Sequence, residues 1–121
     1  MALYENLPVY KAAYDLLLET YRICSNVQRD YRYTLGEKLK QELIEIVVDV
    51  YKANSTVDKT EVLQDARQRV VVVKLQMRIL RDLNQITVKA FALQSERAET
   101  LSKQLAAWYK YSLNKDKILK S

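Results

Sequence analysis

Four cations at helical spacing are the side chains of this chain best suited to chemistry with a partner. They are Arg67, Lys74, Arg78 and Arg81, all within the segment RQRVVVVKLQMRILRDL. At about 100° per residue, an α-helix would place all four on one side. Such a row can neutralise several phosphates, which is the main source of sequence-independent affinity for nucleic acid. The alternative is a solvated stripe whose arginines pair with carboxylates such as Asp82 or Glu45, and Arg81 is the member most expected to do so.

A second group of cations surrounds the segment QRDYRY at residues 28–33. Its members are Arg29, Arg32, Lys38 and Lys40. Tyr31 and Tyr33 are interleaved with them, and a tyrosine beside an arginine can stack on an exposed base. The alternative, which we favour, is that one or both rings close the end of a helical bundle while the phenol hydroxyl reaches a partner. We retain all eight cations as candidate contacts to nucleic acid.

The chain lacks the side chains on which most catalytic sites depend. It has no histidine, one cysteine (Cys24) and one glycine (Gly36). Without histidine there is no Ser-His or Cys-His dyad and no imidazole ligand for a metal ion. One glycine cannot form a glycine-rich phosphate loop, and a cysteine within a helical pattern is expected to be buried. We therefore predict no catalytic residue, no metal, no cofactor and no enzymatic activity.

Positive charge is concentrated in the second half of the chain. The formal net charge is +5. Residues 1–73 hold ten basic and eleven acidic side chains, whereas residues 74–121 hold ten basic and only four acidic ones. Five lysines give the C-terminal end a loose basic character: Lys103, Lys110, Lys115, Lys117 and Lys120. This asymmetry favours a polyanionic partner, although it also suits an ordinary solvated surface.

The helix that must position the first four cations has two apolar sides. One stripe is formed by Leu63, Ala66, Val70, Val73, Met77 and Leu80. A second stripe lies roughly 140° away and is formed by Val72, Leu75, Ile79 and Leu83. Four consecutive valines favour a strand, but the helical period continues for about twenty residues, far beyond a typical strand length. We expect a helix shared between its own core and a second surface.

The remaining pattern predicts an all-α domain, an antiparallel up-down-up-down four-helix bundle. Helices are expected at residues 8–27, 35–53, 60–83 and 88–113. Thr34 with Glu37, and Asp58 with Glu61, have the spacing of capping boxes, with Thr60 as an alternative cap. Asn84 should end the third helix, since Asn tolerates the left-handed conformation, and Thr87 should cap the fourth. No membrane span or signal peptide is expected, so a cytoplasmic location is predicted.

Several segments resemble one family of small four-helix bundles. They are RYTLGEK at 32–38, LQMRILRDLNQIT at 75–87 and LAAWYK at 105–110, with a tyrosine-containing first helix and Tyr51-Lys-Ala53. Over nearly the whole chain, the sequence resembles the accessory variability determinant proteins of diversity-generating retroelements. Relatives of these proteins are bundle proteins encoded in ribosomal RNA intervening sequences. RYTLGEK together with RILRDL is the combination that favours the accessory-protein branch.

This resemblance implies a cytoplasmic homopentameric barrel without enzymatic activity. Such a protein would bind a reverse transcriptase and its template RNA, or DNA, and support mutagenic reverse transcription and retrohoming. Packing around a ring would use the second apolar side, so Val72, Leu75, Ile79 and Leu83 are the predicted subunit interface. The net charge is modest for this family, but a pentamer repeats each local basic stripe five times. A purely structural oligomerisation module, or an intervening-sequence bundle protein, is the alternative.

Overall fold

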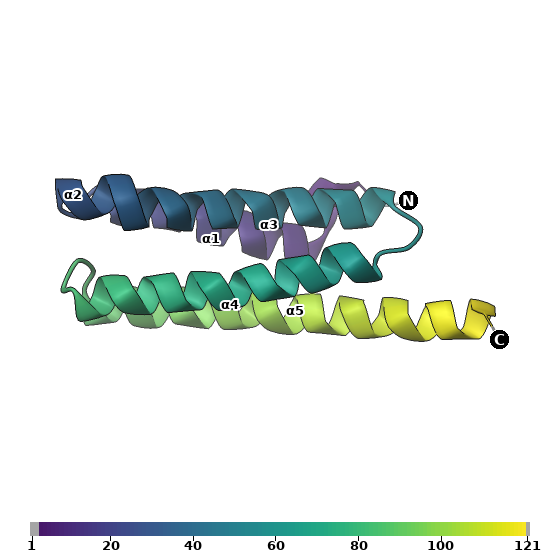
Figure 1. The fold of residues 1–121 in the computed structure, drawn as a ribbon. Helices are drawn as coiled ribbons and strands as arrows, with labels where there is room; N and C mark the ends of the chain where they lie inside the picture. The colour runs from purple at the N-terminus through teal and green to yellow at the C-terminus, as the bar shows by residue number, and fades with distance from the viewer. Residues whose placement is uncertain (1–2, 121) are drawn as a thin grey trace.

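The computed structural model describes residues 3–120, which form an all-helical chain with four long helices (Figure 1). The long helices are α1 (Pro8–Cys24), α3 (Glu37–Ser55), α4 (Thr60–Asp82) and α5 (Val88–Lys120). Shorter elements are the 3₁₀ turn η1 (Tyr4–Asn6), α2 (Arg29–Tyr31) and the π-helical segment η2 (Arg32–Gly36). The sequence pattern therefore identified the all-helical class and the number of long helices.

Each long helix packs against two of the other three. α3 packs against α4, α4 against α5, and α1 against both α5 and α3. α1 and α4 therefore occupy opposite corners of the arrangement. Figure 1 shows the chain turning back at the connection between α3 and α4 and again between α4 and α5. One connection spans residues 56–59 and the other residues 83–87.

The core is built from the predicted inner stripe of α4 and matching stripes of the other helices. All six residues of that stripe are buried, from Leu63 to Leu80. Residues on the other long helices complete the core: Ala13, Leu16, Leu43, Ile46, Val50, Ala98, Leu101 and Leu105. Cys24 is also buried, as expected for a cysteine on an apolar helix face. Trp108 packs against this core and is only partly exposed.

The turn between α4 and α5 follows the chemistry expected from its sequence. Asn84 has a positive φ of 59°. The Gln85 N–H donates to the Leu80 carbonyl at 2.8 Å, and the Asn84 N–H donates to the Arg81 carbonyl at 2.9 Å. This is a Schellman motif with asparagine in the left-handed position. Thr87 Oγ1 then accepts a hydrogen bond from the Ala90 N–H at 3.0 Å and caps α5, as predicted.

The predicted start of the second helix was wrong. The backbone is already helical at Arg29 and continues through η2 into α3, so residues 28–33 do not form an irregular connector. Thr34 is inside this helix, where its hydroxyl donates to the Asp30 carbonyl at 2.8 Å rather than capping an N-terminus. A π-helical turn accommodates the segment without a break, and such turns are often found at functional sites.

Two other helix bounds differ from the prediction. α1 ends at Cys24, and residues 25–27 form a turn. α5 continues to Lys120 instead of ending near residue 113. The segment after residue 113 contains neither glycine nor proline, so no residue in it stops the helix.

Candidate subunit and nucleic-acid interfaces

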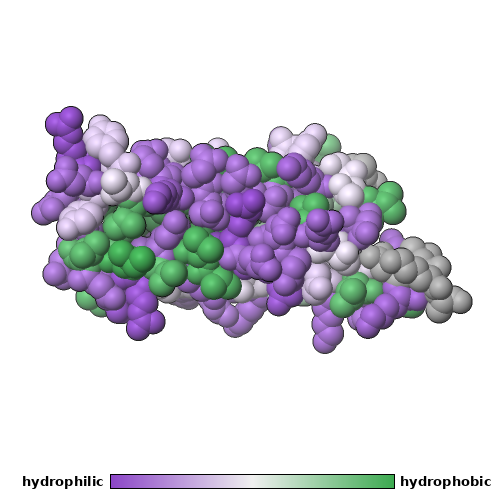
Figure 2. Space-filling model, viewed as in Figure 1, coloured by the Kyte–Doolittle hydropathy of each residue, from purple (hydrophilic) through white to green (hydrophobic). Residues whose placement is uncertain are grey.

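The outer side of α4 carries apolar side chains that no other helix covers in the described part of the chain. The exposed fractions are 40% for Val72, 58% for Leu75 and 39% for Leu83, and Val71 beside them is 65% exposed. Ile79 lies half-buried within the same stripe. Figure 2 shows hydrophobic residues gathered over the half of α4 nearest the α4–α5 turn. We call these five residues the α4 face.

The predicted row of four cations lies along the seam between α4 and α5, and three of the four contact neighbouring side chains. Lys74 Nζ lies 2.7 Å from Glu99 Oε2 on α5. The Arg67 guanidinium lies 4.9 Å from the centre of the Tyr109 ring. Such cation–π contacts help to hold the two helices together.

Arg81 and Arg78, at the C-terminal end of the row, differ in their surroundings. Arg81 pairs with Asp82 at 2.8 Å and stacks over the Phe91 ring at 4.6 Å, in agreement with the structural role expected for it. Arg78 is exposed and makes no ion pair or hydrogen bond within the described residues. The row is therefore partly structural, and Arg78 is its most available member.

The Lys74–Glu99 pair determines the electrostatics at the middle of the row. The hydrogen bond from Lys74 and its positive charge lower the pKa of Glu99. The carboxylate consequently stays ionised at pH values where an ordinary glutamate begins to take up a proton. Both side chains remain partly exposed. An incoming phosphate would compete with Glu99 for the ammonium group of Lys74.

A line of lysines on α5 extends this positive surface. Lys103, Lys110 and Lys117 are spaced by seven residues, so they share one side of the helix, and all three are exposed. Lys103 lies close enough to Glu99 to lower its pKa as well. From the sequence we predicted only a loose basic end here. The spacing of seven residues was the signal that could have placed these three lysines on one side of the helix. The side chain of Lys120 lies outside the described residues. We call Lys74, Lys103, Lys110 and Lys117 the α4–α5 basic surface.

The second predicted group of cations lies on α2, η2 and the start of α3, and three of its four members contact neighbouring groups. Arg32 Nε donates to the Val27 carbonyl at 3.3 Å. Lys40 pairs with Glu37 at 3.3 Å and stacks over the Tyr21 ring at 4.7 Å. Arg29 lies 5.9 Å from the centre of the Tyr33 ring. Lys38 is exposed.

Of the two tyrosines at residues 28–33, one closes the end of the bundle and the other is exposed. Tyr31 packs against the core, as expected for a ring that closes the end of the bundle. Tyr33 is exposed, with Arg29 beside it, and remains available for stacking.

A groove between α3 and α4 is lined mainly by acidic, basic and polar side chains. It is bounded by Glu42, Asp65, Gln68, Arg69 and Val72. Arg69 Nε donates to Asp49 Oδ2 at 3.1 Å, and its Nη1 lies 3.5 Å from Glu42 Oε2. Burial raises the pKa of Asp49 in spite of Arg69. Burial also opposes the charge of Arg69, but Asp49, Glu42 and Glu45 outweigh it and raise the pKa of the guanidinium. Both partners are therefore opposed by desolvation, and only for Asp49, the more deeply buried one, does burial outweigh the attraction of its partner.

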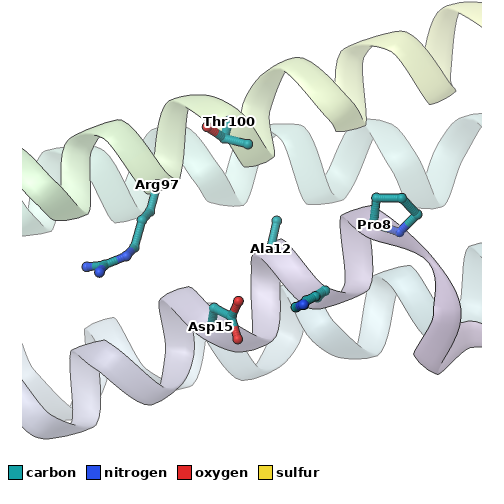
Figure 3. Close-up of a pocket in the computed structure, with 6 residues that line it drawn as sticks. Pro8, Ala12, Asp15, Arg97 and Thr100 are labelled. Carbon is teal, nitrogen blue, oxygen red and sulfur yellow. The ribbon is translucent and has the colours of Figure 1, made fainter.

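A cavity of about 320 Å³ lies between α1 and α5 (Figure 3). Asp15 and Ala12 on α1 face Arg97 and Thr100 on α5 across it. The Arg97 guanidinium donates to Gln94 Oε1 at 2.8 Å, and Gln94 Nε2 in turn donates to Thr20 Oγ1 at 2.9 Å. This hydrogen-bond chain ties α5 to α1.

Three further properties of the chain concern metal ions, membranes and relatives. Among the side chains that the structure describes, no group of three or more His, Cys, Asp or Glu could hold a metal ion. None of the described helices is long and apolar enough to cross a membrane. Comparison with protein families and with curated proteins found no match for the chain.

Proposed function

We propose that this protein is a non-enzymatic accessory subunit of a diversity-generating retroelement. In this proposal, the antiparallel bundle assembles into a cytoplasmic homopentamer that binds template RNA and the reverse transcriptase. It thereby supports mutagenic reverse transcription and retrohoming. The observation that carries the proposal is the uncovered α4 face lying directly beside the α4–α5 basic surface.

The α4 face supports assembly because it is too apolar to be left in water on a small bundle. Contiguous exposed apolar side chains on such a protein usually mark an interaction site. A ring of copies would cover the face on every subunit. The inner stripe of α4 already serves the bundle core, so the outer stripe is free for this second use.

The α4–α5 basic surface supports RNA binding. Three exposed lysines lie in line on α5, and Lys74 lies beside them. Ammonium groups in a row can each neutralise a phosphate without reading sequence. Five copies of the surface in one ring would bind a single RNA at several places, which raises affinity through avidity.

The proposed contact with a reverse transcriptase is supported by the positions of the two segments that carry the family resemblance most specifically. RYTLGEK includes η2 and the start of α3, and RILRDL ends α4. The Gln28 N–H donates to Gln85 Oε1 at 2.9 Å, which links the two connections near these segments. Both segments of the family resemblance therefore occupy the same end of the bundle, where one partner could contact both.

The RNA-binding proposal is tested by reversing charge on α5. Lys103→Glu combined with Lys110→Glu should weaken binding of a labelled RNA, measured by fluorescence anisotropy, and the loss should shrink at high salt. The matched control is Lys11→Glu combined with Lys52→Glu, which changes net charge equally on exposed positions outside α5. Equal effects of the two double variants would refute the assignment of this surface.

The alternative function is a structural oligomerisation module without specific nucleic-acid binding. It is favoured if the wild-type protein assembles but binds no RNA across a salt series. Genomic context gives an independent test, because a retroelement accessory gene should lie near a reverse-transcriptase gene and paired repeats. Absence of both would contradict the proposal and favour an intervening-sequence relative.

A further inference from the structure

The two sides of the α4 face carry opposite charge, and this arrangement indicates how copies would meet. We propose that Arg78 of one copy enters the acidic groove between α3 and α4 of the next copy, with the two α4 helices parallel. The inference rests on the proposed assembly through the α4 face. It goes beyond that assembly by assigning the ionic contact between neighbouring copies.

The carboxylates in and around the α3–α4 groove outnumber the cations beside them. Asp49, Glu42 and Glu45 all act on Arg69, and Asp65 adds a fourth negative charge near Asp49. Arg69 is the cation that bonds directly to this group, and Lys52 acts on Asp49 only through its charge. The groove borders the α4 face at Val72.

Two acceptor atoms beside the face are buried without a donor among the described residues. Glu42 Oε2 accepts no hydrogen bond, although Arg69 lies within ion-pair distance, and Gln76 Oε1 accepts none. Buried acceptors are normally paired, because leaving one unpaired costs its lost hydration. Gln76 lies about one helical turn beyond Val72 on α4, so both acceptors lie along the groove side of the face. Both side chains therefore keep acceptor capacity that the described part of the chain does not use.

Arg78 is the cation that this site fits. It is exposed, makes no ion pair or hydrogen bond within the described part of the chain, and lies about 120° around α4 from Val72. It therefore borders the face on the side opposite to the groove. A guanidinium carries five donors and suits a site rich in oxygen acceptors. Use of Arg78 at the interface removes it from the RNA-contacting set and leaves the α4–α5 basic surface intact.

The distribution of charge selects the orientation of the copies. In a parallel pair of α4 helices, the Arg78 side of one copy meets the groove side of the next. A perpendicular two-fold axis would instead place Arg78 against Arg78 and groove against groove, and like charges would repel. The opposite-charge contact joins two different patches, so it is heterologous and can close a ring.

The positions of Arg78 and Glu42 along the bundle axis allow them to meet when neighbouring copies lie parallel without an axial shift. α3 and α4 run in opposite directions in Figure 1. Arg69 contacts both Asp49 and Glu42, so Glu42 lies beside the part of α4 that follows Arg69. The side chain of Arg78 leans toward the N-terminus of α4, which brings its guanidinium toward the same level.

A charge-swap experiment on the full-length chain tests the inference. The half-assembly concentration is measured by sedimentation velocity for Arg78→Glu, Glu42→Lys and the double variant. Each single change should raise this concentration about tenfold or more, and the double variant should restore most of the loss. Lys11→Glu, at an exposed α1 position outside the α4 face, is the matched control and should leave assembly unchanged. Glu42→Gln, which keeps the side-chain shape, serves if Glu42→Lys disturbs the bundle by facing Arg69.

The outcomes separate this inference from the proposed assembly. If Leu75→Glu dissociates the protein while Arg78→Glu has no effect, copies meet through the α4 face without this contact, and the inference is overturned. If the single changes weaken assembly and the double variant is weaker still, the two residues do not pair, and the inference fails too. If the wild-type chain is a monomer at all concentrations, the proposed assembly itself fails.

Discussion

Replacing Glu99 by Gln should strengthen RNA binding, because Glu99 occupies Lys74 in the absence of RNA. The carboxylate lies 2.7 Å from the ammonium group, and both side chains are partly exposed. A phosphate that binds Lys74 must displace this carboxylate or bind beside its negative charge. Gln keeps the size of the side chain but removes the charge. The change therefore frees a cation without reshaping the α4–α5 seam.

The expected size of the effect follows from the exposure of the pair. Exposed ion pairs change an equilibrium by about 1.4- to 5-fold, so RNA affinity should rise by about that factor. If Lys74 gains one phosphate contact, the slope of log affinity against log salt should steepen by about 0.7 to 0.9. The gain should be largest at low salt, where electrostatic contacts are least screened.

The assay is fluorescence anisotropy of a labelled RNA at several salt concentrations. Glu96→Gln is the matched control, because Glu96 is an exposed carboxylate on the same helix whose described hydrogen bond uses only its backbone carbonyl. Glu96→Gln should raise the logarithm of the RNA affinity by less than half as much as Glu99→Gln does. Equal gains for the two variants would indicate a general effect of net charge. No gain for Glu99→Gln would refute the competition between Glu99 and phosphate.

Two further predictions concern the bundle itself. Thr20→Val should lower the free energy of unfolding in urea by about 1–3 kcal/mol, because it leaves the buried Gln94 amide without its 2.9 Å acceptor. Thr20→Ser keeps the hydroxyl and should cost clearly less, so equal costs would contradict the role of this hydrogen bond. Burial raises the pKa of Asp49 in the folded state. The Asp49 carboxyl therefore stabilises the folded state at pH values below its ordinary pKa of 3.8, and this stabilisation is lost as pH rises through the raised pKa of the folded state. The unfolding free energy of wild type relative to Asp49→Asn should therefore fall with rising pH across that window, whereas a rise would show that Arg69 dominates.

The fold was largely predictable because local chemistry and apolar periodicity agreed along α4 and α5. The inner stripe of α4 followed from spacing alone, and Asn84 and Thr87 marked the turn correctly because each acts on backbone groups within a few residues. The π-helical entry to α3 was missed for a physical reason. A threonine hydroxyl can cap a helix or bond back to a carbonyl within one, and Thr34 does the second.

The candidate site was less predictable because the partner of a charged side chain depends on packing between helices. Nothing in the sequence places Glu99 opposite Lys74, or the Tyr109 ring under Arg67, since these contacts join distant segments. The exposed face could be predicted, because Val72 and Leu75 fall outside the buried stripe by simple helical geometry. What covers that face depends on a second molecule.

The central claim, a ring of subunits that holds RNA, is tested most directly by native mass spectrometry of the purified chain with and without RNA. One chain has a mass of 14.2 kDa, so a pentamer of five chains would appear near 71 kDa. We expect this species alone and, after mixing, the same species carrying an RNA molecule. A 14.2 kDa particle that stays free in the presence of RNA would contradict it.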